Sequence, residues 1–240
     1  MLAITLQRRD FRENDQIISF YTKEAGKIEP VARGVKKIIS KNAPALEPFS
    51  LLDIEIVPGK NYSYVTKAFV VENYPLIRTE VEKLISANLV LSLVNKIVRV
   101  GERDQNIFKL LHSFLKYLNK AEKVSYLLPA AFVGRVTCFL GFTPVLARCS
   151  VCGKTKFKKI LFAAAEGGIV CDICAEINKS TGVILSVKLL KKLRSVFTES
   201  WKEVGEDNLS KLEKELVSKC IFSYASYHLS VKIVLPVGLF

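Results

Sequence analysis

The chain has 240 residues, and its 36 basic and 23 acidic side chains give a formal net charge of +13 at pH 7. Because 50% of the residues are hydrophobic and 10% are aromatic, the composition excludes a disordered chain. No uncharged run exceeds 12 residues, whereas a membrane-spanning helix needs about 20 apolar residues. Arg8 and Arg9 follow the first apolar run, which is the reverse of a signal peptide. We therefore expect a cytoplasmic protein without a membrane partner.

The positive charge is spread along the whole chain. Residues 1–80 carry 12 basic and 10 acidic side chains, residues 81–148 carry 10 and 4, and residues 149–240 carry 14 and 9. This distribution predicts a folded basic surface and not a polybasic tail. Such an excess of Lys and Arg is typical of a polyanionic partner, either nucleic acid or an anionic lipid surface. The alternative is a charged surface that only keeps the chain soluble.

The first 75 residues predict five short strands, rich in Ile, Val, Phe and Tyr and separated by turn-forming residues. The strands are Met1–Arg9, Gln16–Thr22, Lys27–Gly34, Phe49–Val57 and Ser63–Glu72. Five strands are too few for a sandwich and favour a small barrel. The OB-fold is a five-stranded barrel whose open face and loops bind oligonucleotides. An SH3-like barrel would give a similar pattern.

Helical patterns follow the strands. They cover Leu76–Val100, Asn106–Leu118, Ser125–Phe139, Ser186–Phe197 and Asn208 to about Leu229. Gly101 stands where a helix C-cap belongs. We therefore predict an α+β protein with an OB-fold nucleic-acid-binding domain over residues 1–78 and a helical domain over residues 79–240. An insertion interrupts the helical domain at residues 146–178.

Four of the six cysteines form two C-x2-C pairs, Cys149/Cys152 and Cys171/Cys174, with 18 residues between the pairs. This spacing is typical of a zinc site. Two intervening residues let a tight turn direct both sulfurs at one metal, and a hairpin built on Lys156–Ala164 would bring the pairs together. Four thiolates leave no open coordination position, so we expect one structural Zn²⁺ per chain.

Other roles for these cysteines are weaker. Disulfides are rare in the cytosol, and a thioredoxin-type redox pair needs a βαβ context that is absent from the sequence pattern. A four-cysteine iron–sulfur cluster stays open as the alternative metal site. Cys138 and Cys220 lie in apolar helical stretches, and we expect both in the core.

Signals for catalysis are absent from the sequence. His112 and His228 lie among apolar neighbours in helical patterns. Gly153 precedes Lys154 and Thr155 as in a phosphate-binding P-loop, but the glycine that this motif requires five positions earlier is missing. Glu13 and Asp15 could hold a divalent metal, although a turn-capping role is the stronger interpretation. We expect no enzymatic activity.

Basic and aromatic residues alternate in the barrel region, as in single-strand binders that combine a positive groove with stacking platforms. We predict DNA contacts by Arg8, Arg9, Arg12, Arg33, Lys36, Lys37 and Lys41. The aromatic candidates are Phe11, Phe20, Tyr21, Phe49, Tyr62 and Tyr64, of which half or more are expected in the barrel core. A second basic set on the insertion could add phosphate contacts through Lys154, Lys156, Lys158 and Lys159.

Together these features resemble the RecO family of DNA-repair and recombination mediators. The sequence segments that carry the resemblance are Glu13–Asp15, Ala32–Lys37, Leu46–Ser50, Leu140–Pro144, Arg148–Lys154 and Glu166–Cys174. They extend from about residue 10 to residue 174, and the helices after Ser186 match only in general character. Some members of this family lack the cysteines, so the zinc site supports the resemblance without being required by it.

The resemblance implies a nucleoid-associated mediator that binds single- and double-stranded DNA and anneals complementary strands. It also implies contact with the acidic tail of single-stranded-DNA-binding protein (SSB), pairing with RecR, and through RecR the loading of RecA. An acidic tail with a terminal aromatic residue needs a basic rim around an apolar pocket. By charge and region, the candidates for that rim are Arg99, Arg103, Lys109, Lys116, Arg135 and Arg148.

Two other functions share these sequence features. A zinc-ribbon module that binds RNA or assists transcription would have the same barrel, cysteines and basicity. A nuclease could use acidic residues at the rim of the barrel. Competition between structured RNA and single-stranded DNA would separate the first from the leading hypothesis, and a cleavage assay with Mg²⁺ or Mn²⁺ would separate the second.

Overall fold

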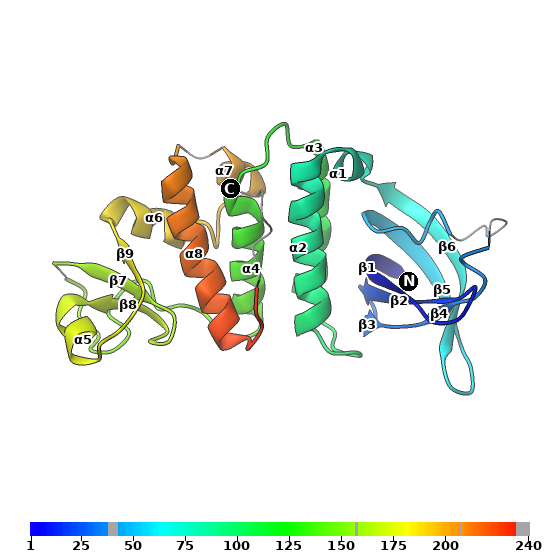
Figure 1. Cartoon of the computed structure of the whole chain (residues 1–240), viewed down its shortest axis with the longest axis horizontal. Helices are drawn as coiled ribbons and strands as arrows, with labels where there is room; N and C mark the ends of the chain where they lie inside the picture. The colour runs from blue at the N-terminus through cyan, green and yellow to red at the C-terminus, as the bar shows by residue number, and fades with distance from the viewer. Residues whose placement is uncertain (38–42, 157, 207, 234–240) are drawn as a thin grey trace. The chain divides into compact units, whose positions relative to one another are not determined.

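A computed structural model describes residues 1–37, 43–156, 158–206 and 208–233 (Figure 1). Its internal contacts divide the chain into two compact units, Met1–Ala121 and Glu122–Phe240. The domain boundary that the sequence predicts at residue 78 stays a prediction, and Lys41 lies outside the described residues. Within the described ranges, the helices are all too short or too polar to cross a bilayer.

The first unit begins with a β-barrel. Its strands are β1 (Leu2–Asp10), β2 (Gln16–Thr22), β3 (Gly26–Ile28), β4 (Val31–Ala32), β5 (Ser50–Pro58) and β6 (Ser63–Asn73). They follow the order β1-β5-β6-β4-β2-β3, and β1 also pairs with β2. Five strands thus close on themselves, while β3 extends the sheet beside β2. The expected five-stranded, OB-like barrel is confirmed.

The third expected strand, Lys27–Gly34, is divided into β3 and β4. Pro30 lies between them and has no backbone N–H to donate to the sheet. Its carbonyl still accepts a hydrogen bond of 3.0 Å from the backbone N–H of Ile18. Both short strands therefore pair with β2, which runs past the interruption without a break.

The barrel core contains buried side chains from all five closing strands and from the segment between β4 and β5. They are Ala3, Ile18, Phe20, Ala32, Val35, Leu46, Leu52, Ile54, Val65 and Ala68. Tyr21 is also buried, and its hydroxyl both accepts from the N–H of Asp104 and donates to the carbonyl of Asp104, each at 3.1 Å. The barrel is thereby fixed to the N-cap of the helix Gln105–Lys120.

Three helices complete the first unit: α1 (Pro75–Thr79), α2 (Val81–Ile97) and α3 (Gln105–Lys120). The single helix expected over Leu76–Val100 is wrong, because Glu80 is extended and separates α1 from α2. This break lets the Glu80 carboxylate accept from the buried Lys83 ammonium at 2.9 Å, while the same ammonium donates to the carbonyl of Asn119 on α3. Burial of a charge requires such partners.

The capping role expected for Gly101 is also wrong. The C-cap of α2 is Val98. Gly101 instead has a φ of 84° and donates its N–H to the carbonyl of Lys27 at 2.8 Å, which joins the α2–α3 connection to β3.

The second unit combines helices with a small sheet. Its elements are α4 (Leu127–Phe139), β7 (Ile160–Ala163), β8 (Gly168–Cys171), α5 (Asp172–Ile177), β9 (Val183–Leu185), α6 (Val187–Ser195), α7 (Trp201–Gly205) and α8 (Lys211–His228). The strands follow the order β8-β7-β9. α4 packs against α8. The sequence predicts a hairpin built on Lys156–Ala164. In the structure, the strand β7 begins at Ile160 and pairs with β8.

Candidate metal centre and nucleic-acid interface

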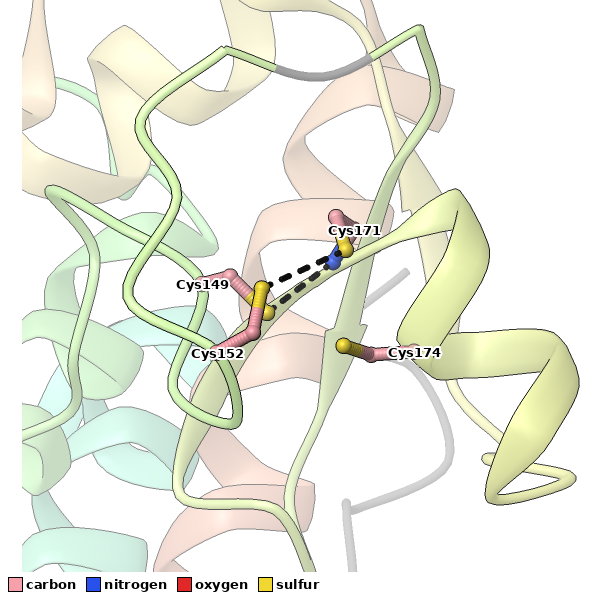
Figure 2. A group of neighbouring side chains, drawn as sticks. All are labelled: Cys149, Cys152, Cys171 and Cys174. Atoms are coloured by element: carbon pink, nitrogen blue, oxygen red, sulfur yellow. Dashed lines mark hydrogen bonds between the residues drawn. The ribbon is translucent and has the colours of Figure 1, made fainter.

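Four cysteines from separate elements converge in the second unit (Figure 2). Cys149 and Cys152 lie on the loop after α4, Cys171 ends β8, and Cys174 lies on the first turns of α5. Their sulfur atoms all lie within 4.8 Å of one another. The cluster could therefore hold a metal ion, as the spacing of the two pairs predicts.

The sulfur separations, all within 4.8 Å, are compatible with a single tetrahedrally coordinated ion. Four sulfurs at about 2.3 Å from one zinc would lie about 3.8 Å apart, and the Sγ atoms of Cys152 and Cys171 are separated by 3.8 Å. A cluster of several irons would need a wider cage, because its own atoms stand between the thiolates. The backbone N–H of Cys171 also donates to the Sγ of Cys149 at 3.4 Å, the kind of outer contact that orients a ligand.

Two of the four thiols differ in how readily they ionise. Burial raises the pKa of Cys149, but hydrogen bonds from the backbone of Cys152 and Cys171 outweigh it and lower that pKa to about 6. The pKa of Cys174 is raised to about 12, first by its hydrogen bond with Cys171 and then by burial. The Cys149 thiolate therefore forms more readily than that of Cys174, and a bound cation would favour the thiolate form of both.

A second candidate site lies on the barrel. An open pocket of about 420 Å³ is formed by the β1–β2 loop and by the loop that follows β4. Its lining residues are Arg12, Glu13, Asn14, Asp15, Arg33, Gly34 and Lys37. Three of the seven predicted DNA contacts, Arg12, Arg33 and Lys37, are thus brought to one cavity. This cavity can accept an anionic group such as a phosphate.

The two loops of this pocket are joined by direct hydrogen bonds. The Asp15 carboxylate accepts from the N–H of Gly34 at 2.8 Å, and the carbonyl of Asn14 accepts from the N–H of Lys36 at 3.1 Å. Asp15 therefore holds the two loops together through its side chain, and the turn-capping role that the sequence predicts for it stays a prediction. Its carbonyl also accepts from the N–H of Phe11 at 3.1 Å within the β1–β2 loop.

Three other predicted DNA contacts are engaged by carboxylates of the same unit. Arg8 pairs with Glu47, and its guanidinium also donates to Gln16. Arg9 lies 3.2 Å from Glu29, and Lys36 lies 3.0 Å from Asp10. Gln16 and Lys36 lower the pKa of Asp10 by donating to its carboxylate. The near balance of 12 basic and 10 acidic residues in positions 1–80 was the sequence signal for such pairing.

The structure divides the aromatic candidates into two groups. Phe20, Tyr21 and Phe49 are buried, which agrees with the expectation that half of them belong to the core. Phe11, Tyr62 and Tyr64 lie beside the pocket loops and the β5–β6 hairpin, where they retain contact with solvent.

The six residues expected to hold an acidic tail are divided between the two units. Arg99 and Arg103 are exposed in the α2–α3 connection, and Lys109 is exposed on α3. Lys116, also on α3, pairs with Glu72 at 3.2 Å. Burial would raise the pKa of Glu72, but the nearby Lys116 and His112 outweigh it and lower that pKa.

Arg135 and Arg148 belong to the second unit. Arg135 is half-buried on α4 and donates to the carbonyls of Val196 and Glu199, while its guanidinium lies 4.3 Å over the ring of Trp201. Burial lowers the pKa of Arg135. Its contacts thus join α4 to the segment between α6 and α7. Arg148, in contrast, is exposed immediately before the first cysteine. A role of either arginine in partner binding stays a prediction.

Comparison with known families decides the assignment. The family model described as Recombination protein O N terminal matches residues 1–74, and the model described as Recombination protein O C terminal matches residues 78–234. The chain belongs to the RecO family. The resemblance predicted from the sequence motifs is thereby confirmed. The first RecO model covers the barrel with its pocket, and the second covers the four cysteines.

Curated RecO relatives match over most of their length. DNA repair protein RecO of Pelotomaculum thermopropionicum is 29% identical over 234 residues, which cover 95% of this chain and 88% of that protein. The protein of the same name from Desulforamulus reducens is 30% identical over 232 residues, which cover 96% of this chain and 90% of that protein. DNA repair protein RecO of Geobacter metallireducens is 31% identical over 187 residues, which cover 75% of this chain and 74% of that protein.

Proposed function

We propose that this RecO-family chain is a non-enzymatic mediator of DNA repair and homologous recombination in the cytoplasm, associated with the nucleoid. It binds single- and double-stranded DNA and anneals complementary strands. With RecR it loads RecA onto single-stranded DNA covered by SSB. The observation that carries the DNA-binding part is the barrel pocket, where Arg12, Arg33 and Lys37 converge.

The position of this pocket supports binding of a nucleic-acid backbone. OB-folds bind oligonucleotides with, among other parts, the loop between their first two strands, and the β1–β2 loop supplies four of the residues that line the pocket. Its three cations outnumber the carboxylates of Glu13 and Asp15, and the latter is engaged by Gly34. Phosphate contacts would release counterions, which makes affinity strongly dependent on salt.

Annealing requires neutralisation of two phosphate backbones, and the cysteine-bearing segment offers a second basic surface. The segment from Arg148 to Lys159 contains five basic residues and no acidic one. All five basic side chains, Arg148, Lys154, Lys156, Lys158 and Lys159, are exposed. We assign the four lysines to the second strand, whereas Arg148 stays among the candidates for the SSB tail. The metal in the cage is proposed to be one structural Zn²⁺, held by Cys149, Cys152, Cys171 and Cys174 and supplying only folding energy.

The test of DNA binding and annealing compares two triple variants of equal charge. Arg12, Arg33 and Lys37 are replaced by Gln in one, and the exposed residues Lys120, Lys123 and Lys211 in the other. We expect the first variant to bind single strands more weakly and to lose about 2 in the slope of log affinity against log salt, since each phosphate contact contributes about 0.7. It should also anneal SSB-coated complementary strands more slowly than the second variant.

Three outcomes would contradict the proposal. Failure of the wild-type chain to accelerate annealing at low salt would remove that activity. A strong preference for structured RNA over single-stranded DNA would favour the RNA-binding alternative. Cleavage of labelled DNA in Mg²⁺ or Mn²⁺ would indicate a nuclease with Glu13 and Asp15 near its centre.

The SSB contact is tested separately. We propose that the acidic tail binds through one or more of Arg99, Arg103, Lys109, Lys116, Arg135 and Arg148. In a pull-down, the chain should capture full-length SSB and should not capture SSB that lacks its last residues. Equal capture of both forms would exclude recognition of the tail.

A further inference from the structure

Aromatic side chains and cations form two groups of contacts beside the barrel pocket. The guanidinium of Arg12 lies 5.0 Å from the ring centre of Phe11. That ring meets Tyr62 edge to face, with ring centres 5.2 Å apart and an angle of 66°. On the other side, the guanidinium of Arg33 lies 3.8 Å over the ring of Tyr64. Both arginines line the pocket, so each places an aromatic ring beside it.

Tyr64 positions Arg33. Arg33 occupies one face of its ring, and a Cβ added at Gly59 would lie 2.5 Å from the ring, so backbone closely approaches the ring as well. An arginine over an aromatic ring keeps its N–H donors free at the edge of the guanidinium. Tyr64 therefore orients the guanidinium of Arg33 toward the pocket and has little free surface of its own.

Tyr62, unlike Tyr64, keeps much of its surface exposed. It lies at the tip of the β5–β6 hairpin, and 40% of the residue is exposed. The turn that carries it is closed by a hydrogen bond of 2.9 Å from the N–H of Gly59 to the carbonyl of Tyr62. The ring of Phe11 supports it from the side. A supported but exposed ring is what a stacking platform requires.

We propose that Tyr62, supported by Phe11, stacks on an unpaired DNA base while the adjacent phosphate lies in the pocket of Arg12, Arg33 and Lys37. This inference rests on the proposed DNA binding and adds a selectivity to it. Both faces of a base are covered inside a duplex, so only an unpaired and unstacked base can reach the ring. The cations contact any phosphate backbone, whereas Tyr62 distinguishes single strands from duplexes.

The experiment replaces the ring and keeps its bulk. Tyr62→Leu removes the π-face, Tyr62→Phe retains it, and Tyr227→Leu is the control at another exposed tyrosine, on α8. Dissociation constants of the full chain are measured for a single strand and for a duplex of equal length. Because one stacked base contributes about 5- to 150-fold in affinity, Tyr62→Leu should weaken single-strand binding by that factor and leave duplex binding unchanged.

The remaining readouts separate stacking from charge. Tyr62→Phe and Tyr227→Leu should bind as the wild type does, and the salt dependence of Tyr62→Leu should be unchanged, because no phosphate contact is lost. A single strand with abasic sites should bind the wild type about as weakly as an intact strand binds Tyr62→Leu. Thermal melting of each variant confirms that the barrel is folded.

The outcomes distinguish this inference from the proposed function. If the wild type binds DNA through the pocket and Tyr62→Leu loses no affinity, or loses it equally for single strands and duplexes, the stacking platform is overturned and the proposed function stands. If the wild type binds neither form of DNA, both are overturned.

Discussion

The carboxylate of Asp15 accepts a hydrogen bond of 2.8 Å from the backbone N–H of Gly34, which lies 19 residues further along the chain. This bond joins the β1–β2 loop to the loop after β4, and these two loops supply the cations of the barrel pocket. Arg12 and Arg33 are therefore held in place before any ligand arrives. Preorganisation of this kind reduces the ordering cost of binding.

The first prediction compares Asp15→Ala with Glu13→Ala. Each variant removes one negative charge from the pocket lining, so electrostatics alone would make both bind DNA more tightly. We expect Glu13→Ala to do so, and Asp15→Ala to bind several-fold more weakly because the loops separate. Asp15→Ala should also lose about 1.5–3 kcal/mol of stability, the contribution of a hydrogen bond to a charged group. Fluorescence anisotropy and urea unfolding measure the two effects, and tighter binding by both variants would contradict the preorganised pocket.

The second prediction concerns Arg135. Arg135→Ala removes donors to the carbonyls of Val196 and Glu199 and the cation over Trp201, and it should cost about 2–4 kcal/mol in the free energy of unfolding. Arg148→Ala, at an exposed position, should stay within about 0.5 kcal/mol of the wild type. Trp201 is the single tryptophan of the chain, so its fluorescence reports the unfolding of this unit. Equal stability of the two variants would show that the Arg135 contacts contribute nothing to folding.

The third prediction concerns removal of the metal. Elemental analysis of the native chain should give one zinc, and iron with visible absorbance would contradict that assignment. In a Cys138→Ala/Cys220→Ala background, the four cage thiols should react slowly with a thiol reagent while zinc is bound, and all four should react after chelation. Because metal binding supplies about 10–16 kcal/mol in small zinc modules, chelation should also lower the midpoint of unfolding reported by Trp201. Rapid reaction of four thiols before chelation would show that no metal protects them.

The fourth prediction is a pH dependence of stability from Cys220 on α8. Burial raises the pKa of this thiol from its ordinary value of 9.0 to about 12. Between these values the folded chain keeps the proton and the unfolded chain releases it, so the stabilisation is complete below pH 9 and is lost as the pH rises toward 12. Each pH unit in that window should cost up to about 1.4 kcal/mol.

Urea unfolding between pH 8.5 and 10.5 measures this loss. Cys220→Ala should be less stable at neutral pH because it leaves a cavity, but its stability should fall less steeply with pH. Cys138→Ala is the matched control at a less buried thiol, whose pKa is also raised by burial. An unchanged pH slope in Cys220→Ala would exclude the buried thiol as its source.

The breaks in regular structure show why sequence patterns are insufficient for some elements. The pattern of Lys27–Gly34 correctly predicts β structure, and the segment is divided at Pro30 because proline has no backbone N–H to donate. The break at Glu80 has no comparable local signal, and the buried Lys83 just after it finds a partner in Asn119, 36 residues further along the chain. Local propensity sets the type of an element, whereas partners distant in sequence decide where it ends.

The predicted cations show the same limit at the pocket. Arg8 and Arg12 are four residues apart and chemically identical, yet Arg8 pairs with Glu47 and Arg12 lines the pocket. Only the fold brings Glu47 to Arg8 from 39 residues away. Seven candidates could therefore be named from composition, but the pairing that separates engaged from available charges could not.

The sequence by itself determined the five-stranded barrel, the cysteine cage and the family of this chain. These depend on short-range information: alternation of apolar residues, turn-forming residues between strands, and two residues between paired cysteines. The tertiary structure alone decided which cations line one pocket and which aromatic rings lie beside it. Those outcomes depend on the closure of the barrel, because hydrogen-bonded strands bring the loops around Arg12, Arg33 and Tyr62 together from three separate parts of the chain.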